Sequence, residues 1–161
     1  MKMVIKMPKK VYTGAIFFFL LDLLSKTIAL PLLKKDIEII PNFFYLALAK
    51  NDGAAFSSFS GQRLLLIIIS IAVVLILVKI IKKEELTKLK IVAFAMLLGG
   101  VIGNLFDRLI YGYVIDFLSF FPFGYAFPIF NLADTFIVIG VFLYIIASIG
   151  GKKHANNSKQ N

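Results

Sequence analysis

Four long apolar runs dominate the pattern of hydrophobic and polar positions along the chain. They cover about residues 11–33, 64–81, 89–110 and 129–149. Each run is long enough to cross a hydrocarbon core of about 30 Å as a helix. The pattern therefore predicts an α-helical integral membrane protein with four transmembrane helices.

The segments between these runs differ in character. Residues 34–62 contain two short β-prone stretches, 37–40 and 43–49, with Pro41 and Asn42 between them. Open strand edges cannot face lipid, so we expect a small extracytoplasmic β-rich segment here and a surface loop at 111–127. The polar residues 151–161 are predicted to form a disordered tail. No repeat or second domain is evident, which favours a single membrane domain over residues 1–161.

Lysine clusters predict the orientation in the membrane. The chain is 60% hydrophobic and has a formal net charge of +9. Residues 1–10 and 79–90 carry most of the flanking lysines, whereas 34–62 and 111–127 carry fewer. Because cytoplasmic loops are enriched in Lys and Arg, both termini are expected to be cytoplasmic. The clusters flank apolar runs, so contacts with membrane lipid are expected and no nucleic-acid partner is predicted.

Composition also narrows the possible chemistry. The chain has no Cys, and its one His, His154, lies in the polar tail. Thiolate nucleophiles, Ser-His-Asp catalysis and His- or Cys-based metal sites are therefore disfavoured. We predict no cofactor and no metal. Catalysis, if present, must use Asp, Glu, Ser, Thr, Lys, Tyr or Asn side chains.

Charged groups inside apolar runs mark candidate functional sites, because they are costly to place in hydrocarbon. Asp22 and Lys26 are four residues apart and share a helix face. They either form a self-contained ion pair with Lys26 extending outward, or support an active site. Asp107 and Arg108 could form an interfacial pair that anchors the end of the third helix.

Asp116 and Asp134 are the candidate catalytic pair. Asp116 is expected in the surface loop, and Asp134 in the first turn of the fourth helix, with Asn131 as N-cap. The predicted topology brings both carboxylates to the extracytoplasmic face. Two close carboxylates share one proton, so one can activate a water while the other polarises a carbonyl. This is the chemistry of an aspartic protease.

Four blocks of residues, in order along nearly the whole chain, carry a family resemblance. They are Asp22-x-x-x-Lys26; Asn51-x-Gly53-Ala54-Ala55-Phe56; Gly99-Gly100-x-x-Gly103-Asn104-x-x-Asp107-Arg108 with Gly112-x-Val114-x-Asp116-Phe117; and Pro128-x-Phe130-Asn131-x-Ala133-Asp134. The chain resembles the bacterial lipoprotein signal peptidases, or signal peptidase II. It departs from the family pattern at Leu23, Val101 and Phe127, and none of these departures affects a carboxylate.

The resemblance implies an aspartic endopeptidase of the bacterial inner membrane that acts on diacylglyceryl-modified prolipoproteins. It implies cleavage on the N-terminal side of the lipidated Cys and inhibition by globomycin-type cyclic peptides. Asp116 and Asp134 would be the catalytic dyad. The residues implied as supporting or substrate-contacting are Asp22, Lys26, Asn51, Gly53, Asn104, Arg108, Asn131 and Ala133.

Three other interpretations of the sequence remain. A small ion- or proton-coupled transporter would use Asp22, Lys26, Asp107 and Arg108 as a relay. A Ser/Lys peptidase would use Ser57 as nucleophile and Lys26 as base. A purely structural membrane protein would tolerate substitution of both Asp116 and Asp134. Substitution of these two aspartates distinguishes an aspartic peptidase from the Ser/Lys peptidase and from the structural protein, and the absence of a repeat argues against the transporter.

Overall fold

Four helices and a small sheet make up the computed structural model, which describes residues 8–53 and 58–157. The helices are α1 (Lys9–Leu32), α2 (Arg63–Ile81), α3 (Lys88–Ile110) and α4 (Leu132–Asn157). Each contains a stretch long and apolar enough to cross a membrane. The first three begin within two residues of the predicted ranges, and α4 begins three residues later than expected.

Helix α3 is the centre of the bundle and packs against α1, α2 and α4. Two glycines allow α1 to approach it closely. A Cβ at Gly99 would lie 2.7 Å from Phe18 Cβ, and one at Gly103 would overlap the Asp22 carboxylate. Gly100 faces the other way, where a Cβ would lie 2.5 Å from the Ala133 carbonyl oxygen of α4. The small-residue spacing of α3 thus brings α1 and α4 against one helix.

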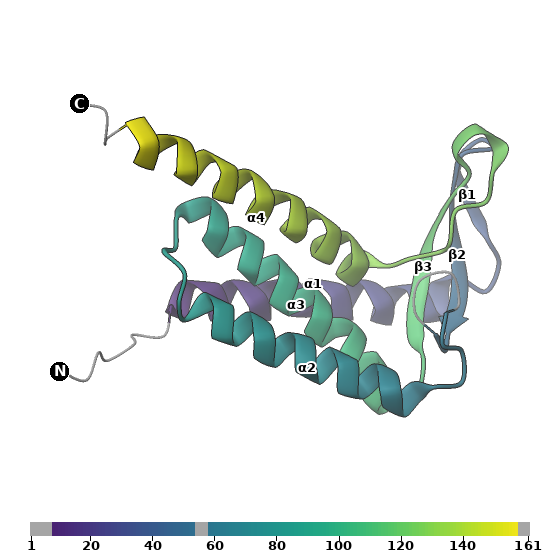
Figure 1. Ribbon diagram of the computed structural model, residues 1–161. Helices are drawn as coiled ribbons and strands as arrows, with labels where there is room; N and C mark the ends of the chain where they lie inside the picture. Colours follow the sequence, from purple (N-terminus) through teal and green to yellow (C-terminus); the bar gives the residue numbers. More distant parts are fainter. Residues whose placement is uncertain (1–7, 54–57, 158–161) are drawn as a thin grey trace.

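A three-stranded antiparallel sheet lies across one end of the bundle (Figure 1). Its strands are β1 (Ile37–Ile40), β2 (Phe44–Asn51) and β3 (Val114–Phe120), in the order β1-β2-β3. The β-prone character of 37–40 and 43–49 correctly predicted the first two strands. Strand β2 pairs Ala49 with Asp116 of β3.

Asp116 therefore lies on a strand, and the prediction of a loop at this position was wrong. Residues Val114–Phe117 are all buried, so the strand lacks the alternation of polar and apolar side chains that marks a half-buried strand. After the short 3-10 turn η2 (Pro122–Gly124), the chain doubles back and Phe130 bridges Leu118. This return leads directly into α4.

The predicted disordered tail is also corrected in part, because α4 continues to Asn157. Gly150 and Gly151 each disfavour a helix by only about 1 kcal/mol relative to Ala, and no Pro follows them. The Lys9 end of α1, the loop between α2 and α3, and the Asn157 end of α4 all lie opposite the sheet (Figure 1). The lysine-rich loop and the sheet therefore occupy opposite ends of the bundle.

Candidate active site

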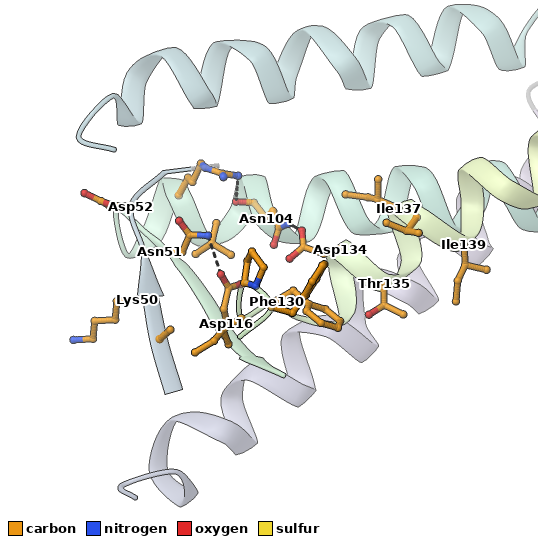
Figure 2. Close-up of a pocket in the computed structure, with 17 residues that line it drawn as sticks. Lys50, Asn51, Asp52, Asn104, Asp116, Phe130, Asp134, Thr135, Ile137 and Ile139 are labelled. Carbon is orange, nitrogen blue, oxygen red and sulfur yellow. Dashed lines mark hydrogen bonds between the residues drawn. The ribbon is translucent and has the colours of Figure 1, made fainter. Parts of the chain in front are cut away.

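Asp116 and Asp134 line one cavity of about 830 Å³ where the sheet meets α3 and α4 (Figure 2). Asp116 of β3 is only 1% exposed, and Asp134 in the first turn of α4 is half-buried. Their polar neighbours in the cavity wall include Asn51, Asn104 and Arg108. The apolar wall is formed by Ala49, Val114, Phe127, Pro128, Ile129, Phe130, Ile137, Val138 and Ile139.

Amide groups hold all four oxygens of the two carboxylates. Asn51 Nδ2 donates to Asp116 Oδ2 at 2.9 Å, and Asn131 Nδ2 donates to Asp116 Oδ1 at 2.7 Å. Asn104 Nδ2 donates to Asp134 Oδ1 at 2.7 Å, and the Asn131 backbone N–H donates to Asp134 Oδ2 at 3.3 Å. Each carboxylate is thereby fixed in orientation, and each oxygen keeps a further acceptor site.

Asn131 connects the two carboxylates. The Asp134 backbone N–H donates to Asn131 Oδ1 at 2.9 Å, so Asn131 caps α4 as predicted. The reciprocal bond from the Asn131 N–H to the Asp134 side chain completes a capping box. Because the same residue also donates to Asp116, the cap sets the position of one carboxylate relative to the other.

Burial raises the pKa of Asp116 to about 6. The hydrogen bonds from Asn51 and Asn131 lower the pKa, and the nearby charge of Asp134 raises it further. A carboxyl group with this pKa exchanges its proton near neutral pH. Asp116 can therefore take part in acid–base chemistry that an ordinary exposed aspartate performs poorly.

Lys26 lies at the centre of a buried polar cluster next to the carboxylates. Its Nζ is 2.7 Å from Asp22 Oδ2, 2.9 Å from Asp107 Oδ2 and 3.0 Å from Asn104 Oδ1. Asp22, Lys26 and Asp107 are each 1% exposed. The predicted Asp22–Lys26 pair is confirmed, whereas the alternative in which Lys26 extends outward is wrong.

The two carboxylates of the cluster accept hydrogen bonds from the backbone of the segments that carry Asp134 and Asp116. Asp22 Oδ1 accepts from the Ala133 N–H at 2.9 Å, in the first turn of α4. Asp107 Oδ2 accepts from the Ile115 N–H at 3.1 Å, next to Asp116. Lys26 thus connects, through two carboxylates, to the residues that precede Asp134 and Asp116 in the chain.

Asp107 was missed as a site residue in the sequence, where it was paired with Arg108. The only described cation that bonds it is Lys26, because Asp107 and Arg108 are neighbours in a helix and point apart. One signal could have found the pairing. A buried acid in one transmembrane helix needs a cation. Of the cations in the other apolar runs, Lys26 lies well inside its run, whereas Lys79 lies near the end of 64–81.

Arg108 contacts backbone carbonyls. Its Nη2 donates to Gly53 O at 2.9 Å, and its Nη1 lies 3.4 Å from Asn104 O. The Gly53 N–H donates to Asn51 Oδ1 at 3.0 Å, and the turn that this bond closes orients Asn51 toward Asp116. Ala54, Ala55 and Phe56 of the second sequence block, and Ser57, lie outside the described residues.

The candidate residues therefore converge in space, although not all play the same part. The carboxylates are surrounded by Asn51, Asn104, Asn131 and Arg108. The backbone behind them is positioned by Asp22, Lys26, Gly53 and Ala133. Within residues 8–53 and 58–157, no group of three or more His, Cys, Asp or Glu side chains has a metal-binding arrangement. The fold and this site define a four-helix membrane protein with an amide-bridged pair of carboxylates at one end.

Comparison with known proteins identifies the family. The family model described as signal peptidase (SPase) II matches residues 14–150. A lipoprotein signal peptidase of Neisseria meningitidis serogroup C (strain 053442) is 38% identical over 74% of this chain and 76% of its own length. One of Staphylococcus aureus (strain JH9) is 36% identical over 96% of this chain and 98% of its own length.

Two solved structures share the fold of this chain. A bacterial membrane enzyme determined by the in meso method at 2.3 Å resolution superposes with a TM-score of 0.82 at 34% identity, covering 91% of this chain and 92% of that chain. A second bacterial membrane enzyme, at 1.9 Å resolution, gives a TM-score of 0.76 at 35% identity, covering 87% of this chain and 92% of that chain. The chain belongs to the signal peptidase II family. It is an aspartic endopeptidase and a multi-pass protein of the bacterial inner membrane.

Proposed function

We propose that Asp116 and Asp134 are the catalytic dyad of this peptidase and that water is the nucleophile. The observation that carries the proposal is the shared cavity, in which each carboxylate oxygen is held by an amide donor. Carboxylates fixed in this way are oriented before substrate arrives, which favours reaction in one geometry.

In the proposed reaction the pair holds one proton. The ionised carboxylate accepts a proton from water as the water oxygen bonds to the scissile carbonyl carbon. The protonated carboxyl donates its proton to the carbonyl oxygen. As the tetrahedral intermediate collapses, the C–N bond breaks and the amine leaves with the proton that the dyad took from water. One hydroxyl of the intermediate gives its proton to the other carboxylate, so the dyad again holds one proton. The pKa of Asp116, about 6, suits this exchange.

The proposed substrate is a prolipoprotein whose Cys carries diacylglycerol, cleaved N-terminal to that Cys. Its acyl chains must stay in hydrocarbon, so the scissile bond lies close to the headgroup level. The cavity suits this geometry, because it combines polar groups with apolar residues. The apolar residues are Phe127–Phe130, just before α4, and Ile137–Ile139, near the N-terminal end of α4. Globomycin-type cyclic peptides are expected to occupy the same cavity.

The proposed orientation puts both termini in the cytoplasm and the cavity near the extracytoplasmic face. Residues 79–90 are rich in lysine, and their loop lies at the end of the bundle opposite the sheet (Figure 1). The positive-inside rule assigns that loop to the cytoplasm. A cysteine accessibility assay tests this, since the chain has no native Cys.

The decisive experiment compares wild type with Asp116→Asn and Asp134→Asn on a diacylglyceryl-modified prolipoprotein in detergent. We expect each variant to fold and to lose about 10³-fold or more of the activity, as when a general base or acid is removed. Near-normal turnover by either variant overturns the dyad. It would favour the Ser57/Lys26 alternative, in which Lys26 would first have to leave its ion pairs with Asp22 and Asp107.

A further inference from the structure

The turn between β3 and α4 presents aromatic side chains with few neighbours. Phe123 is 99% exposed, Tyr125 is 78% exposed and Phe127 is 49% exposed. We call these three residues the aromatic tip. Single exposed apolar residues are common on proteins, but adjacent exposed aromatic rings at one turn mark a contact surface.

Phe123 of the tip has an unusual backbone conformation. Phe123 has φ 56° and ψ 26°, in the left-handed region. Gly and Asn adopt this region readily, whereas a bulky aromatic residue does so only where the surroundings require it. Since Phe123 is almost fully exposed, packing within the protein does not explain the choice of Phe. Strain at such a position indicates a function.

The amino-acid composition around the tip indicates what kind of partner the tip contacts. Residues 117–133 contain no Asp, Glu, Lys or Arg, although most of this segment lies outside the helices. Residues 34–38, at the other side of the sheet, contain four charged residues. Residues 117–133 instead hold six Phe and one Tyr, and aromatic side chains are typical of the boundary between lipid headgroups and acyl chains.

The placement of the tip agrees with a lipid contact. The sheet lies across the end of the bundle, and its turn end reaches sideways past the start of α4 (Figure 1). Because the helices cross the bilayer, this end lies over the lipid beside the bundle. The nearby side of α4 exposes Val138 and Phe142, which is expected of a surface that faces acyl chains.

We propose that the aromatic tip inserts into the outer leaflet at the level of the headgroup–acyl boundary, with lipid as its partner. The tip is continuous with β3, the strand that carries Asp116. Anchoring the turn therefore fixes the position of one end of this strand relative to the membrane surface. The choice of the outer leaflet rests on the orientation proposed above, but the lipid contact is independent of the dyad, since it concerns where the sheet lies in the bilayer.

The chain contains no Trp, so one introduced Trp reports on one site. Phe123→Trp is reconstituted in phosphatidylcholine–phosphatidylglycerol nanodiscs whose acyl chains are brominated either near the headgroup or near the methyl end. Phe142→Trp on α4 is the control within the acyl region, and Glu85→Trp in the loop between α2 and α3 is the exposed control.

We expect bromine near the headgroup to quench Phe123→Trp by about half or more, and bromine near the methyl end to quench it less. Iodide should quench it less than it quenches Glu85→Trp. Strong iodide quenching without bromolipid quenching overturns the proposal. Protection from iodide without bromolipid quenching also overturns it, and would indicate a protein contact at the tip.

A second pair of variants removes the ring and keeps the turn. Asn tolerates the left-handed conformation, so Phe123→Asn should retain the wild-type melting temperature. In this background Tyr125→Trp should lose bromolipid quenching relative to Tyr125→Trp alone. Unchanged quenching of Tyr125→Trp would mean that Phe123 does not anchor the tip, and would overturn its assigned role.

Discussion

Lys26 on α1 and Asp107 on α3 form a buried ion pair, with 2.9 Å between Nζ and Oδ2. The same Nζ also lies 2.7 Å from Asp22 Oδ2. One cation therefore serves two carboxylates, and these carboxylates accept hydrogen bonds from the backbone next to the proposed dyad. Because the cluster has one cation and two carboxylates, loss of the cation should destabilise the protein more than loss of one carboxylate.

Lys26→Met should destabilise the protein far more than Asp107→Asn. Removal of the lysine leaves two buried carboxylates without a cation, which typically costs about 3–5 kcal/mol. Asn at position 107 retains an oxygen for the Ile115 N–H and leaves Lys26 paired with Asp22, so we expect a loss of about 1 kcal/mol. Thermal unfolding in detergent measures both. Equal losses would show that Lys26 does not balance the cluster.

The stability of Asp116→Asn relative to wild type should depend on pH. The pKa of Asp116 is about 6 in the folded protein, above its ordinary value of 3.8. The folded state therefore binds more protons than the unfolded state between these values, and wild-type stability falls as pH rises through them. The whole effect is about 3 kcal/mol at most, from about 1.36 kcal/mol per pKa unit.

The measurement is the difference in melting temperature between the two proteins from pH 4 to pH 7. The side-chain amide of the Asp116→Asn variant offers one acceptor oxygen to two amide donors, which adds a penalty that does not vary with pH. Only the pH-dependent part tests the prediction. A difference that stays constant over this range would show that the pKa of Asp116 is not shifted.

Loss of the Asn51 side chain should shift the pH profile of activity. The Asn51 hydrogen bond lowers the pKa of Asp116, so Asn51→Ala should raise it. The limb of the kcat/KM profile near pH 6 should then move to higher pH. Glu38→Gln on the exposed strand β1 is the control and should leave the limb in place. If Asn51→Ala leaves the limb in place, the limb reports the ionisation of a group other than Asp116.

Gly100→Ala should impair both packing and catalysis. The added Cβ would lie 2.5 Å from the Ala133 carbonyl oxygen and 2.8 Å from Ile137 Cγ1. Relief of this overlap displaces the first turn of α4, which carries Asp134. We expect a loss of about 1–3 kcal/mol from overpacking and about 10–100-fold in kcat from misplacement of the carboxylate.

Ser70→Ala is the matched control for Gly100→Ala. Ser70 lies on α2, and its hydroxyl donates to Leu66 O of the same helix. Activity and melting temperature should stay close to wild type. If Gly100→Ala behaves like Ser70→Ala, then α3 and α4 are less closely packed at Ala133 than the structure indicates.

The sequence by itself determined the features that depend on neighbouring residues. The apolar runs identified four membrane-length helices, and β-prone stretches identified β1 and β2. A spacing of four residues paired Asp22 with Lys26, and the position of Asn131 predicted the cap of α4. The ordered sequence blocks indicated the family. The helix, strand, spacing and cap signals each lie within one element, and each family block is a short pattern of near neighbours, which is why composition and spacing reveal them.

Only the tertiary structure decided how separate elements combine. It put Asp116 on a strand, since burial on both faces hides the alternation that marks β3. It paired Asp107 with Lys26 because glycines on α3 let α1 approach closely. It also made Asn131 both the cap of α4 and a donor to Asp116. Such contacts join residues far apart in the chain, so they depend on packing geometry that no local pattern encodes.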